Sequence, residues 1–204
     1  MEHLENTPEL SILVSWEVNC ELKHIIFSEN CFYVQFKAPN HKELKEFVFG
    51  KEENYTEFDW SEDCDVKTIS CTWQETIDLL KPSLYEFSKS IGKRFKYDVH
   101  DPWINCYKKN GFQEIHDHIK CDLSCVFFPE VQENFGKFYF YNRYANSLNS
   151  SWARLIGNTS TWYPDIQSGD IIFFPSAILH GVSPHKSNTM RKTFSCNFSF
   201  DLPD

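Results

Sequence analysis

The chain has 204 residues, a formal net charge of −9, 19 Phe, 9 Tyr and 6 Trp, but only 7 Gly. This length suits one domain with a full core across residues 1–204, and the aromatic content excludes a disordered or low-complexity chain. The negative charge argues against broad affinity for nucleic acids, because non-specific binding to phosphate backbones is mainly electrostatic.

The N-terminus and the cysteines both indicate an intracellular protein. MEHLENTPEL has no basic stretch followed by an apolar run, and no part of the sequence has the run of about 18 apolar residues that a membrane helix needs. We therefore expect no signal peptide, no membrane partner and a cytoplasmic location. The 8 cysteines form no CxxC pair, so we expect reduced thiols rather than a disulfide framework.

The N-terminal segment, residues 1–70, reads as strands that flank the core of the fold. Residues 11–20 and 31–38 are rich in β-branched and aromatic side chains, and the second run alternates between apolar and polar positions. Residues 57–65 are strongly acidic, and we expect them to form a solvated loop.

Residues 72–92 change to a helical period. Apolar side chains recur there at a spacing of three to four residues, with Thr72 placed to cap the N-terminus and Gly92 placed to end the helix. Pro82 near the middle conflicts with an uninterrupted helix. We interpret the segment as one amphipathic helix, and a split at Pro82 into two shorter helices stays open as the alternative.

Residues 95–200 return to short strands that are separated by turn residues. The runs are FKYDVH, WINCYKK, FQEIHDHI, LSCVFF, KFYFYN, DIIFF and RKTFSCNFSF. Many short strands after a single helical segment predict a mainly β fold with flanking helices, either a barrel or a sandwich.

Two histidines stand two residues apart in the run FQEIHDHI. Side chains at positions i and i+2 share one face of a strand, so His116 and His118 point one way and Asp117 points the other. Two imidazoles on one face can bind one metal ion. This pair alone is a weak signal, because surface histidines often show the same spacing.

The downstream sequence strengthens the metal-site interpretation. SGDIIFFPSAILH consists of a turn, an apolar strand, a second turn and a lone histidine, His180. The last strand then opens with Arg191 and Thr193, an arginine and a hydroxyl two positions apart and therefore on one face.

In order and spacing, these residues resemble the iron(II)- and 2-oxoglutarate-dependent oxygenases, most closely the small prolyl-hydroxylase-like branch of bacteria and phages. The family pattern is His-x-Asp, then a distant His, then an Arg with a Ser or Thr two positions on. The resemblance covers residues 96–200. It implies a double-stranded β-helix, a jelly roll similar to the cupins, over residues 95–200, and an enzyme that uses Fe(II), 2-oxoglutarate and O2.

One position departs from the family pattern, because His118 stands where the family has its carboxylate. The usual ligand set is two histidines and one carboxylate. Three sets stay open here: all of His116, His118 and His180; His116 and His180 alone, with His118 beside the metal or facing the substrate; or a set in which a bulge brings Asp117 inward. We favour the three-histidine site, because the His-x-His variant recurs in this branch.

The resemblance also implies a cosubstrate site. In this family 2-oxoglutarate chelates the iron through its 2-oxo group and C1 carboxylate, and its C5 carboxylate needs a cation deeper in the barrel. Arg191 would supply a charge-assisted pair and Thr193 a hydroxyl on the same strand face. Asn105, Tyr107 and Tyr139 are further candidates to bind the cosubstrate from neighbouring strands.

The implied reaction is a hydroxylation of an unactivated C–H bond, coupled to decarboxylation of 2-oxoglutarate to succinate. We expect the substrate to be a side chain of a protein or peptide, with proline as the first candidate by family analogy. A small molecule or a nucleobase is the alternative, since a fold does not determine a substrate. The departure at His118 also keeps open a barrel that binds a metal or ligand without catalysis.

Two further features bear on substrate binding. The segment 142–164 is long and rich in aromatic and basic residues for a connection, so we expect it to contact the substrate. His185, shortly after His180, could reach the mouth of the site, but we favour an exposed loop position for it.

Overall fold

The computed structural model describes residues 31–55, 66–143, 151, 155 and 159–201. The expected strand at 11–20 and the expected acidic loop at 57–65 lie outside these described residues. None of the helices in the described residues is long and apolar enough to cross a membrane.

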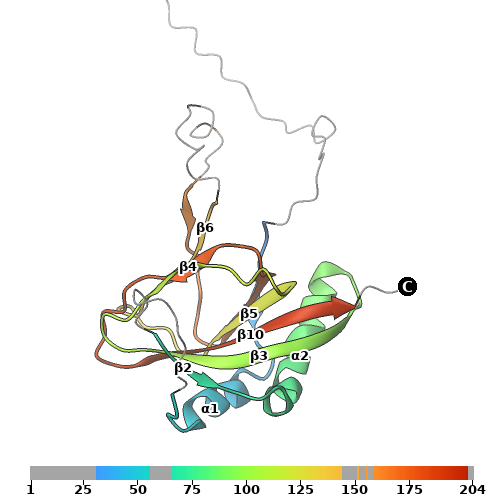
Figure 1. Ribbon diagram of the computed structural model, residues 1–204, viewed down its shortest axis with the longest axis horizontal. Coiled ribbons are helices and arrows are strands. Elements are labelled where there is room, and N and C mark those ends of the chain that lie inside the picture. The colour runs from blue at the N-terminus through green and yellow to red at the C-terminus, as the bar shows by residue number, and fades with distance from the viewer. Residues whose placement is uncertain (1–30, 56–65, 144–150, 152–154, 156–158, 202–204) are drawn as a thin grey trace, which may run out of the picture.

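Two antiparallel sheets form the body of the molecule and face one another (Figure 1). The larger sheet contains, in spatial order, β1 (Val34–Lys37), β8 (Asp170–Pro175), β5 (Leu123–Phe128), β10 (Arg191–Asp201), β3 (Lys96–Tyr107) and β2 (Lys67–Ser70). The smaller sheet contains β4 (Gln113–His116), β9 (His180–Val182), β6 (Phe138–Tyr141) and β7 (Thr161–Trp162). The prediction of a mainly β fold with flanking helices is therefore confirmed.

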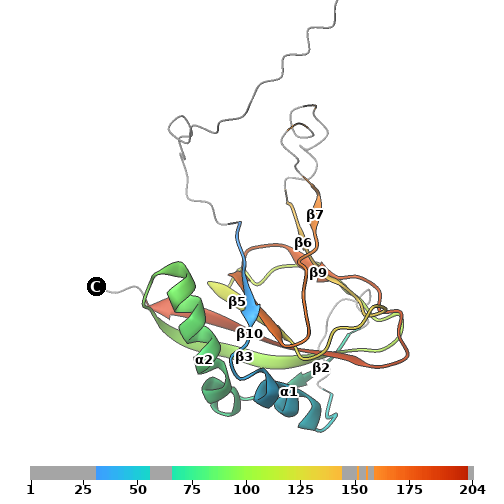
Figure 2. The same ribbon diagram turned by 180° about the vertical axis from the view of Figure 1, so that it is seen from behind.

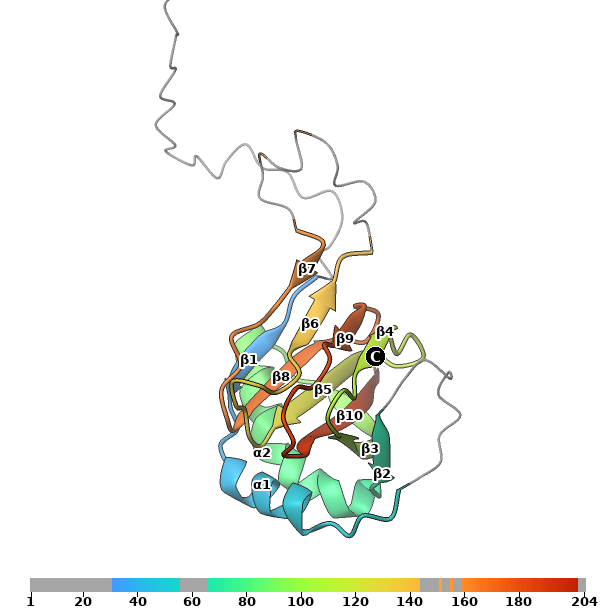
Figure 3. The ribbon, with the colours of Figure 1, turned by 90° about the vertical axis from the view of Figure 1, so that its left-hand side faces the viewer.

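Helices α1 (His41–Gly50) and α2 (Trp73–Ile91) cover the outer face of the larger sheet, as Figure 2 shows from behind. The smaller sheet lies against the opposite face, which is clearest in the side view of Figure 3. Strand alternation separates two apolar clusters accordingly. Phe173 and Phe194 belong to the cluster beneath the helices, whereas Phe174 belongs to the cluster between the sheets. The space between the sheets is where polar side chains also gather.

Helix α2 forms as one continuous helix through Pro82. The hydroxyl of Thr72 accepts a hydrogen bond from the backbone N–H of Glu75, and the Glu75 carboxylate accepts one from the backbone N–H of Thr72. Gly92 ends the helix in the left-handed conformation with φ 65°, which costs glycine little. Leu80 and Leu84, on either side of Pro82, are buried against the sheet. We attribute the continuity of the helix to this packing.

We expect Thr72→Ala to lower the free energy of unfolding by about 1 kcal/mol, because it removes one half of the reciprocal cap. Urea denaturation of the two proteins measures the difference. Thr159 is exposed, so Thr159→Ala is the matched control, and equal stability of both variants would contradict a role for the cap.

Helix α1 corrects the prediction that residues 1–70 supply only strands. Leu44 and Val48 are fully buried and lie one helical turn apart. The apolar run from Phe47 to Phe49 resembles a strand in the sequence. The buried residues Leu44 and Val48, however, have the spacing of a helix that packs one face against the larger sheet. The nearby strands β1 and β2 do form, each at four residues.

Candidate metal and cosubstrate site

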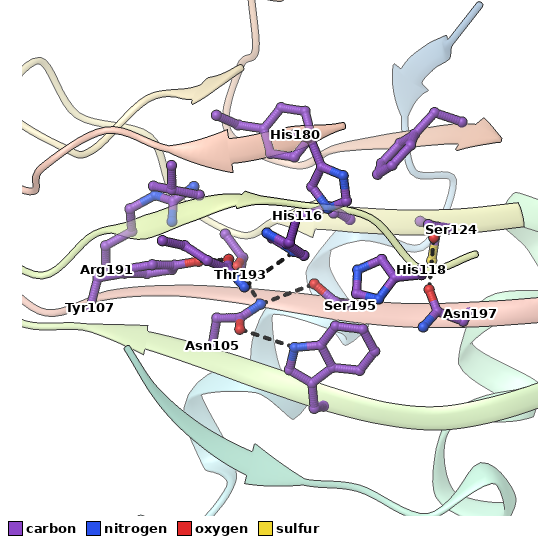
Figure 4. Close-up of a pocket in the computed structure, with 17 residues that line it drawn as sticks. Asn105, Tyr107, His116, His118, Ser124, His180, Arg191, Thr193, Ser195 and Asn197 are labelled. Carbon is purple, nitrogen blue, oxygen red and sulfur yellow. Dashed lines mark hydrogen bonds between the residues drawn. The ribbon is translucent and has the colours of Figure 1, made fainter. Parts of the chain in front are cut away.

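Three histidines meet in the space between the two sheets (Figure 4). One nitrogen each from His116, His118 and His180 can be chosen so that all three lie within 4.8 Å of one another. His116 and His180 are register partners on the adjacent strands β4 and β9, and their ring centroids are 4.3 Å apart. His118 follows just beyond the end of β4. The structure thus brings together the three histidines that the sequence analysis singled out.

A register shift in β4 shapes this end of the site. Gln113 pairs with Val182 and His116 pairs with His180, so three steps along β4 match two along β9. The shift places Gln113 and His116 on the same inward face although they are three residues apart. Ile115 points outward between them and is 41% exposed.

Two of the three imidazoles are held in a defined tautomer. His116 Nδ1 lies 2.8 Å from the carbonyl oxygen of Glu114, and His180 Nδ1 lies 2.9 Å from that of Ile178. A carbonyl oxygen only accepts, so Nδ1 carries the proton in each ring. Nε2 is then the atom with which each histidine can bind a metal ion. Metal-binding histidines commonly donate a hydrogen bond from their other ring nitrogen, as these two do.

The protein environment keeps these histidines neutral. Burial lowers the pKa of His116 and lowers that of His180 well below the ordinary value. Burial and the neighbouring His116 lower the pKa of His118 to about 4. Neutral imidazoles are the form that binds a metal ion, so the donor set fits a divalent transition metal near neutral pH.

Asp117 is turned away from the three histidines. Its carboxylate oxygen Oδ2 lies 3.4 Å from Nη2 of Arg143, in an ion pair at the protein surface. The bulge in β4 precedes His116 and does not bring Asp117 inward. The structure therefore argues against the alternative in which Asp117 completes the metal site, because its carboxylate pairs with Arg143 and is not among the grouped ligand atoms.

A buried arginine occupies the other end of the same cavity. Arg191 is only 3% exposed, and its guanidinium carbon lies 4.6 Å from the ring centroid of Tyr107. Burial lowers its pKa, and the neighbouring Tyr107 opposes this shift. Its Nη1 has no hydrogen-bond partner among the described residues, and no acidic side chain from the described chain lines the cavity. A buried cation in this setting needs an anion, and a carboxylate would supply one.

Thr193 and Asn105 lie beside Arg191 on the cavity face of the larger sheet. They are register partners on β10 and β3. The Asn105 amide donates to the hydroxyls of Thr193 at 3.4 Å and Ser195 at 3.1 Å, and it accepts from the indole N–H of Trp103 at 3.0 Å. The predicted residues Arg191, Thr193, Asn105 and Tyr107 are thus brought together along one wall.

Tyr139 is the one predicted site residue that the structure places elsewhere. On β6, Phe138 faces the cavity, whereas Tyr139 faces the outside of the smaller sheet and packs against Tyr163 at 5.5 Å. The prediction was wrong because odd and even positions of a strand point to opposite faces. Tyr139 lines a separate groove with Tyr163, Ile115 and Pro184.

Gln113 is the functional-site residue that the sequence analysis missed. It is 5% exposed and lines the cavity between Tyr107 and His116. A strand without a bulge would place Gln113 on the face opposite His116, and only the register shift reverses this. Polar side chains of Ser124 and Asn197, bonded to each other at 2.7 Å, also line the wall near His118.

His185 is fully buried and does not lie at the surface as we expected. Its Nδ1 accepts a hydrogen bond from the backbone N–H of Gly136 at 3.2 Å, so Nε2 donates to the carbonyl oxygen of Thr189 at 2.7 Å. Its ring packs against Phe135. His185 therefore fixes two loops together.

We expect His185→Leu to lower the free energy of unfolding by about 2 kcal/mol, because the buried N–H of Gly136 and carbonyl of Thr189 each lose a partner. Fe(II) affinity should not change in the folded variant. Urea denaturation and Fe(II) titration check the two statements separately, and a loss of Fe(II) binding would make His185 a candidate ligand again.

Much of the expected substrate-binding segment 142–164, including Tyr144, Trp152 and Arg154, lies outside the described residues. Of its described residues, Trp162 and Tyr163 are exposed, and the Trp162 indole N–H donates to the hydroxyl of Tyr33 at 3.3 Å. The expectation that this segment contacts a substrate stays a prediction.

Comparisons with known proteins agree with this geometry. Residues 101–197 match the family model described as "Putative 2OG-Fe(II) oxygenase". A solved 2OG-Fe(II) oxygenase family oxidoreductase from Burkholderia pseudomallei is 16% identical, with a TM-score of 0.61 over 82% of this chain and 84% of that one. No curated protein matches the sequence.

Two further solved structures share the fold at low identity. Streptomyces hygroscopicus HygX, crystallised with nickel and 2-oxoglutarate, is 10% identical with a TM-score of 0.58 over 82% of both chains. A Pseudomonas putida prolyl-4-hydroxylase is 11% identical with a TM-score of 0.58 over 83% of this chain and 93% of that one. These likenesses confirm the predicted double-stranded β-helix.

Proposed function

We propose that this chain is an iron(II)- and 2-oxoglutarate-dependent oxygenase, which hydroxylates an unactivated C–H bond while converting 2-oxoglutarate to succinate and carbon dioxide; the family model matched by residues 101–197 supports this proposal. Its cofactors in this role are Fe(II), 2-oxoglutarate and O2. One observation carries the proposal: three neutral histidines and a buried arginine with an unpartnered Nη1 line one cavity.

His116, His118 and His180 would hold the iron. When bound, the iron supplies the redox chemistry that O2 and 2-oxoglutarate need for hydroxylation. The protein fixes the ligand set in advance, since the backbone carbonyls of Glu114 and Ile178 orient two of the rings.

Arg191 and Thr193 would bind the distal carboxylate of 2-oxoglutarate. The guanidinium donates in a fixed planar fork that matches a carboxylate, and the ring of Tyr107 stacks against it and limits its movement. Because burial removes competing water, a charge-assisted pair here is stronger than the same pair at the surface. This anchoring would orient the cosubstrate relative to the histidines.

An apolar wall shields the His180 side of the cavity. Phe174 lies 4.8 Å and Phe138 lies 5.5 Å from the ring of His180, measured between centroids. These side chains restrict water near the ligand nitrogen, which suits a site that must protect a reactive oxidant from side reactions.

We propose a side chain of a protein or peptide as the substrate, with proline as the first candidate. Two observations support this choice. The solved neighbours include a prolyl-4-hydroxylase, and the outer groove lined by Tyr139, Tyr141 and Tyr163 adjoins the cavity through Gln113 and Val182. Aromatic-lined grooves suit extended proline-rich chains.

Small-molecule hydroxylation is the alternative substrate class. The neighbour SnoK is described as a carbocyclase of nogalamycin biosynthesis, and HygX has also been crystallised with hygromycin B. Incubation with proline-containing peptides and with small-molecule panels, followed by mass spectrometry for a gain of one oxygen, separates the two classes.

The proposal is tested by succinate release from 2-oxoglutarate. We expect stoichiometric release that depends on Fe(II) and is lost in His180→Ala. A barrel that binds a metal without catalysis is the competing function, and His118 in place of the family's carboxylate motivates it. Failure to release succinate with any candidate substrate would contradict the oxygenase and favour this second function.

We expect His118→Asp to retain or improve Fe(II) affinity, because the substitution restores the common set of two histidines and one carboxylate. Fe(II) titration and the optical spectrum of the metal complex measure the effect. If neither the affinity nor the spectrum changes, His118 does not bind the metal and the pair His116 and His180 would hold it alone.

A further inference from the structure

A chain of hydrogen bonds runs along the cavity from Tyr107 to His116. The ring of Tyr107 lies against the guanidinium of Arg191, 4.6 Å from its carbon, and the Tyr107 hydroxyl lies 2.8 Å from Oε1 of Gln113. The Gln113 amide nitrogen in turn lies 3.4 Å from Nε2 of His116, whose Nδ1 contacts the carbonyl oxygen of Glu114. The tyrosine that packs on the buried arginine is thereby connected to a proposed metal ligand through Gln113; Figure 4 shows Tyr107, Arg191 and His116 around the same cavity.

The direction of every bond in this chain is fixed by the backbone carbonyl at its end, because a carbonyl oxygen only accepts. His116 Nδ1 therefore donates to Glu114, which leaves a lone pair on Nε2. The Gln113 NH2 group consequently faces His116 and donates to this lone pair, and Oε1 of Gln113 accepts from the hydroxyl of Tyr107.

Metal binding at His116 Nε2 would use the same lone pair that Gln113 contacts. An imidazole nitrogen has one lone pair, so the metal and the amide cannot share it. Gln113 is 5% exposed, and a buried amide N–H that loses its acceptor carries a cost of about 1–3 kcal/mol. Among the described residues, no acidic side chain lines the cavity, so the charged acceptor that would suit this N–H best is a ligand carboxylate.

We propose, as an extension of the proposed function, that Gln113 is a cosubstrate-positioning residue. Its amide N–H, displaced from His116 by the metal, donates to the carboxylate of 2-oxoglutarate nearest the metal. Tyr107 keeps the amide in this orientation by holding Oε1, and Arg191 holds the distal carboxylate. Gln113 and Arg191 would then contact 2-oxoglutarate at its two carboxylates.

The test compares the wild-type protein with Gln113→Leu, which keeps a similar volume and removes the amide. Under anaerobic conditions, we expect the Kd of the Fe(II)-loaded protein for 2-oxoglutarate to rise about tenfold, in line with loss of one hydrogen bond to a charged group. Fe(II) affinity measured without 2-oxoglutarate should not fall, because the amide no longer competes for Nε2. Gln132, an exposed loop residue, supplies the matched control Gln132→Leu, which should change neither constant.

The variant Tyr107→Phe tests the orienting step. It removes the hydroxyl that holds Oε1 while keeping the ring that stacks on Arg191. We expect Tyr107→Phe to raise the Kd for 2-oxoglutarate by a smaller factor than Gln113→Leu does. In the double variant, the rise in Kd should be smaller than the product of the two single rises. Such non-additivity is typical of residues in one hydrogen-bond network.

The outcomes separate this inference from the proposed function. A wild-type protein that binds neither Fe(II) nor 2-oxoglutarate would remove the premise and overturn both. If the wild type binds both, an unchanged Kd for 2-oxoglutarate in Gln113→Leu would overturn the positioning role alone. A parallel loss of Fe(II) affinity, or a lowered melting temperature with an unchanged Kd, would also overturn it and make Gln113 a structural support.

Discussion

Replacing His180 with alanine is expected to weaken Fe(II) binding by about 100-fold or more, a larger loss than the 10–100-fold typical of a residue that merely supports a ligand. His180 is buried, and its tautomer is fixed by the carbonyl of Ile178. The variant retains two imidazoles, His116 and His118, which cannot hold the ion with the same affinity. An anaerobic Fe(II) titration monitored by calorimetry measures the loss of affinity.

The control for this variant is His41→Ala, which removes a histidine from helix α1, on the outer side of the larger sheet. It should bind Fe(II) as the wild type does. Unchanged Fe(II) affinity in a folded His180→Ala protein would contradict the three-histidine site, since every ligand set that remains open includes His180.

Replacing Arg191 with methionine is expected to weaken 2-oxoglutarate binding by about 100-fold or more, which corresponds to about 3 kcal/mol. Methionine is long and unbranched, so it keeps much of the packing on Tyr107 while removing the cation. Fe(II) affinity should change far less, because Arg191 is not among the residues that would hold the metal. Titration of the Fe(II)-loaded protein with 2-oxoglutarate measures the effect.

Lys192→Met is the matched control, because Lys192 is the next residue on the same strand but faces away from the cavity. It is nearly buried and lies 3.5 Å from a carboxylate oxygen of Glu53. The substitution removes an equal charge without touching the cavity. Equal affinity for 2-oxoglutarate in Arg191→Met and wild type would show that the anchor for the cosubstrate lies elsewhere.

The main parts of the site were predictable because strand alternation and chain order are local properties. Arg191 and Thr193 share a strand face at any position in a regular strand, and the structure pairs them with Tyr107 and Asn105 on β3. The two ends of the helix over 73–91 were also predictable, since the capping residues and the C-terminal glycine lie within the helix sequence or next to it, whereas its continuity through Pro82 was left open.

The errors arose where a long-range contact overrides local pattern. The register shift in β4 brings Gln113 inward, and it depends on pairing with β9, where the partner Val182 lies 69 residues after Gln113 in the chain. Burial of His185 likewise depends on Gly136 and Thr189. The error at Tyr139 has a local cause. Neighbouring residues of a strand face opposite sides, so an inward-facing Phe138 requires an outward-facing Tyr139.

The most direct test of the account is an anaerobic titration of the apo protein with Fe(II) and 2-oxoglutarate, observed by visible absorption. A weak charge-transfer band that appears only with both components, and is absent in His180→Ala, is the predicted result for a 2-oxo acid chelated to iron at the histidines. Iron binding without such a band on addition of 2-oxoglutarate would contradict the shared site, and it would favour a protein that binds metal without catalysis.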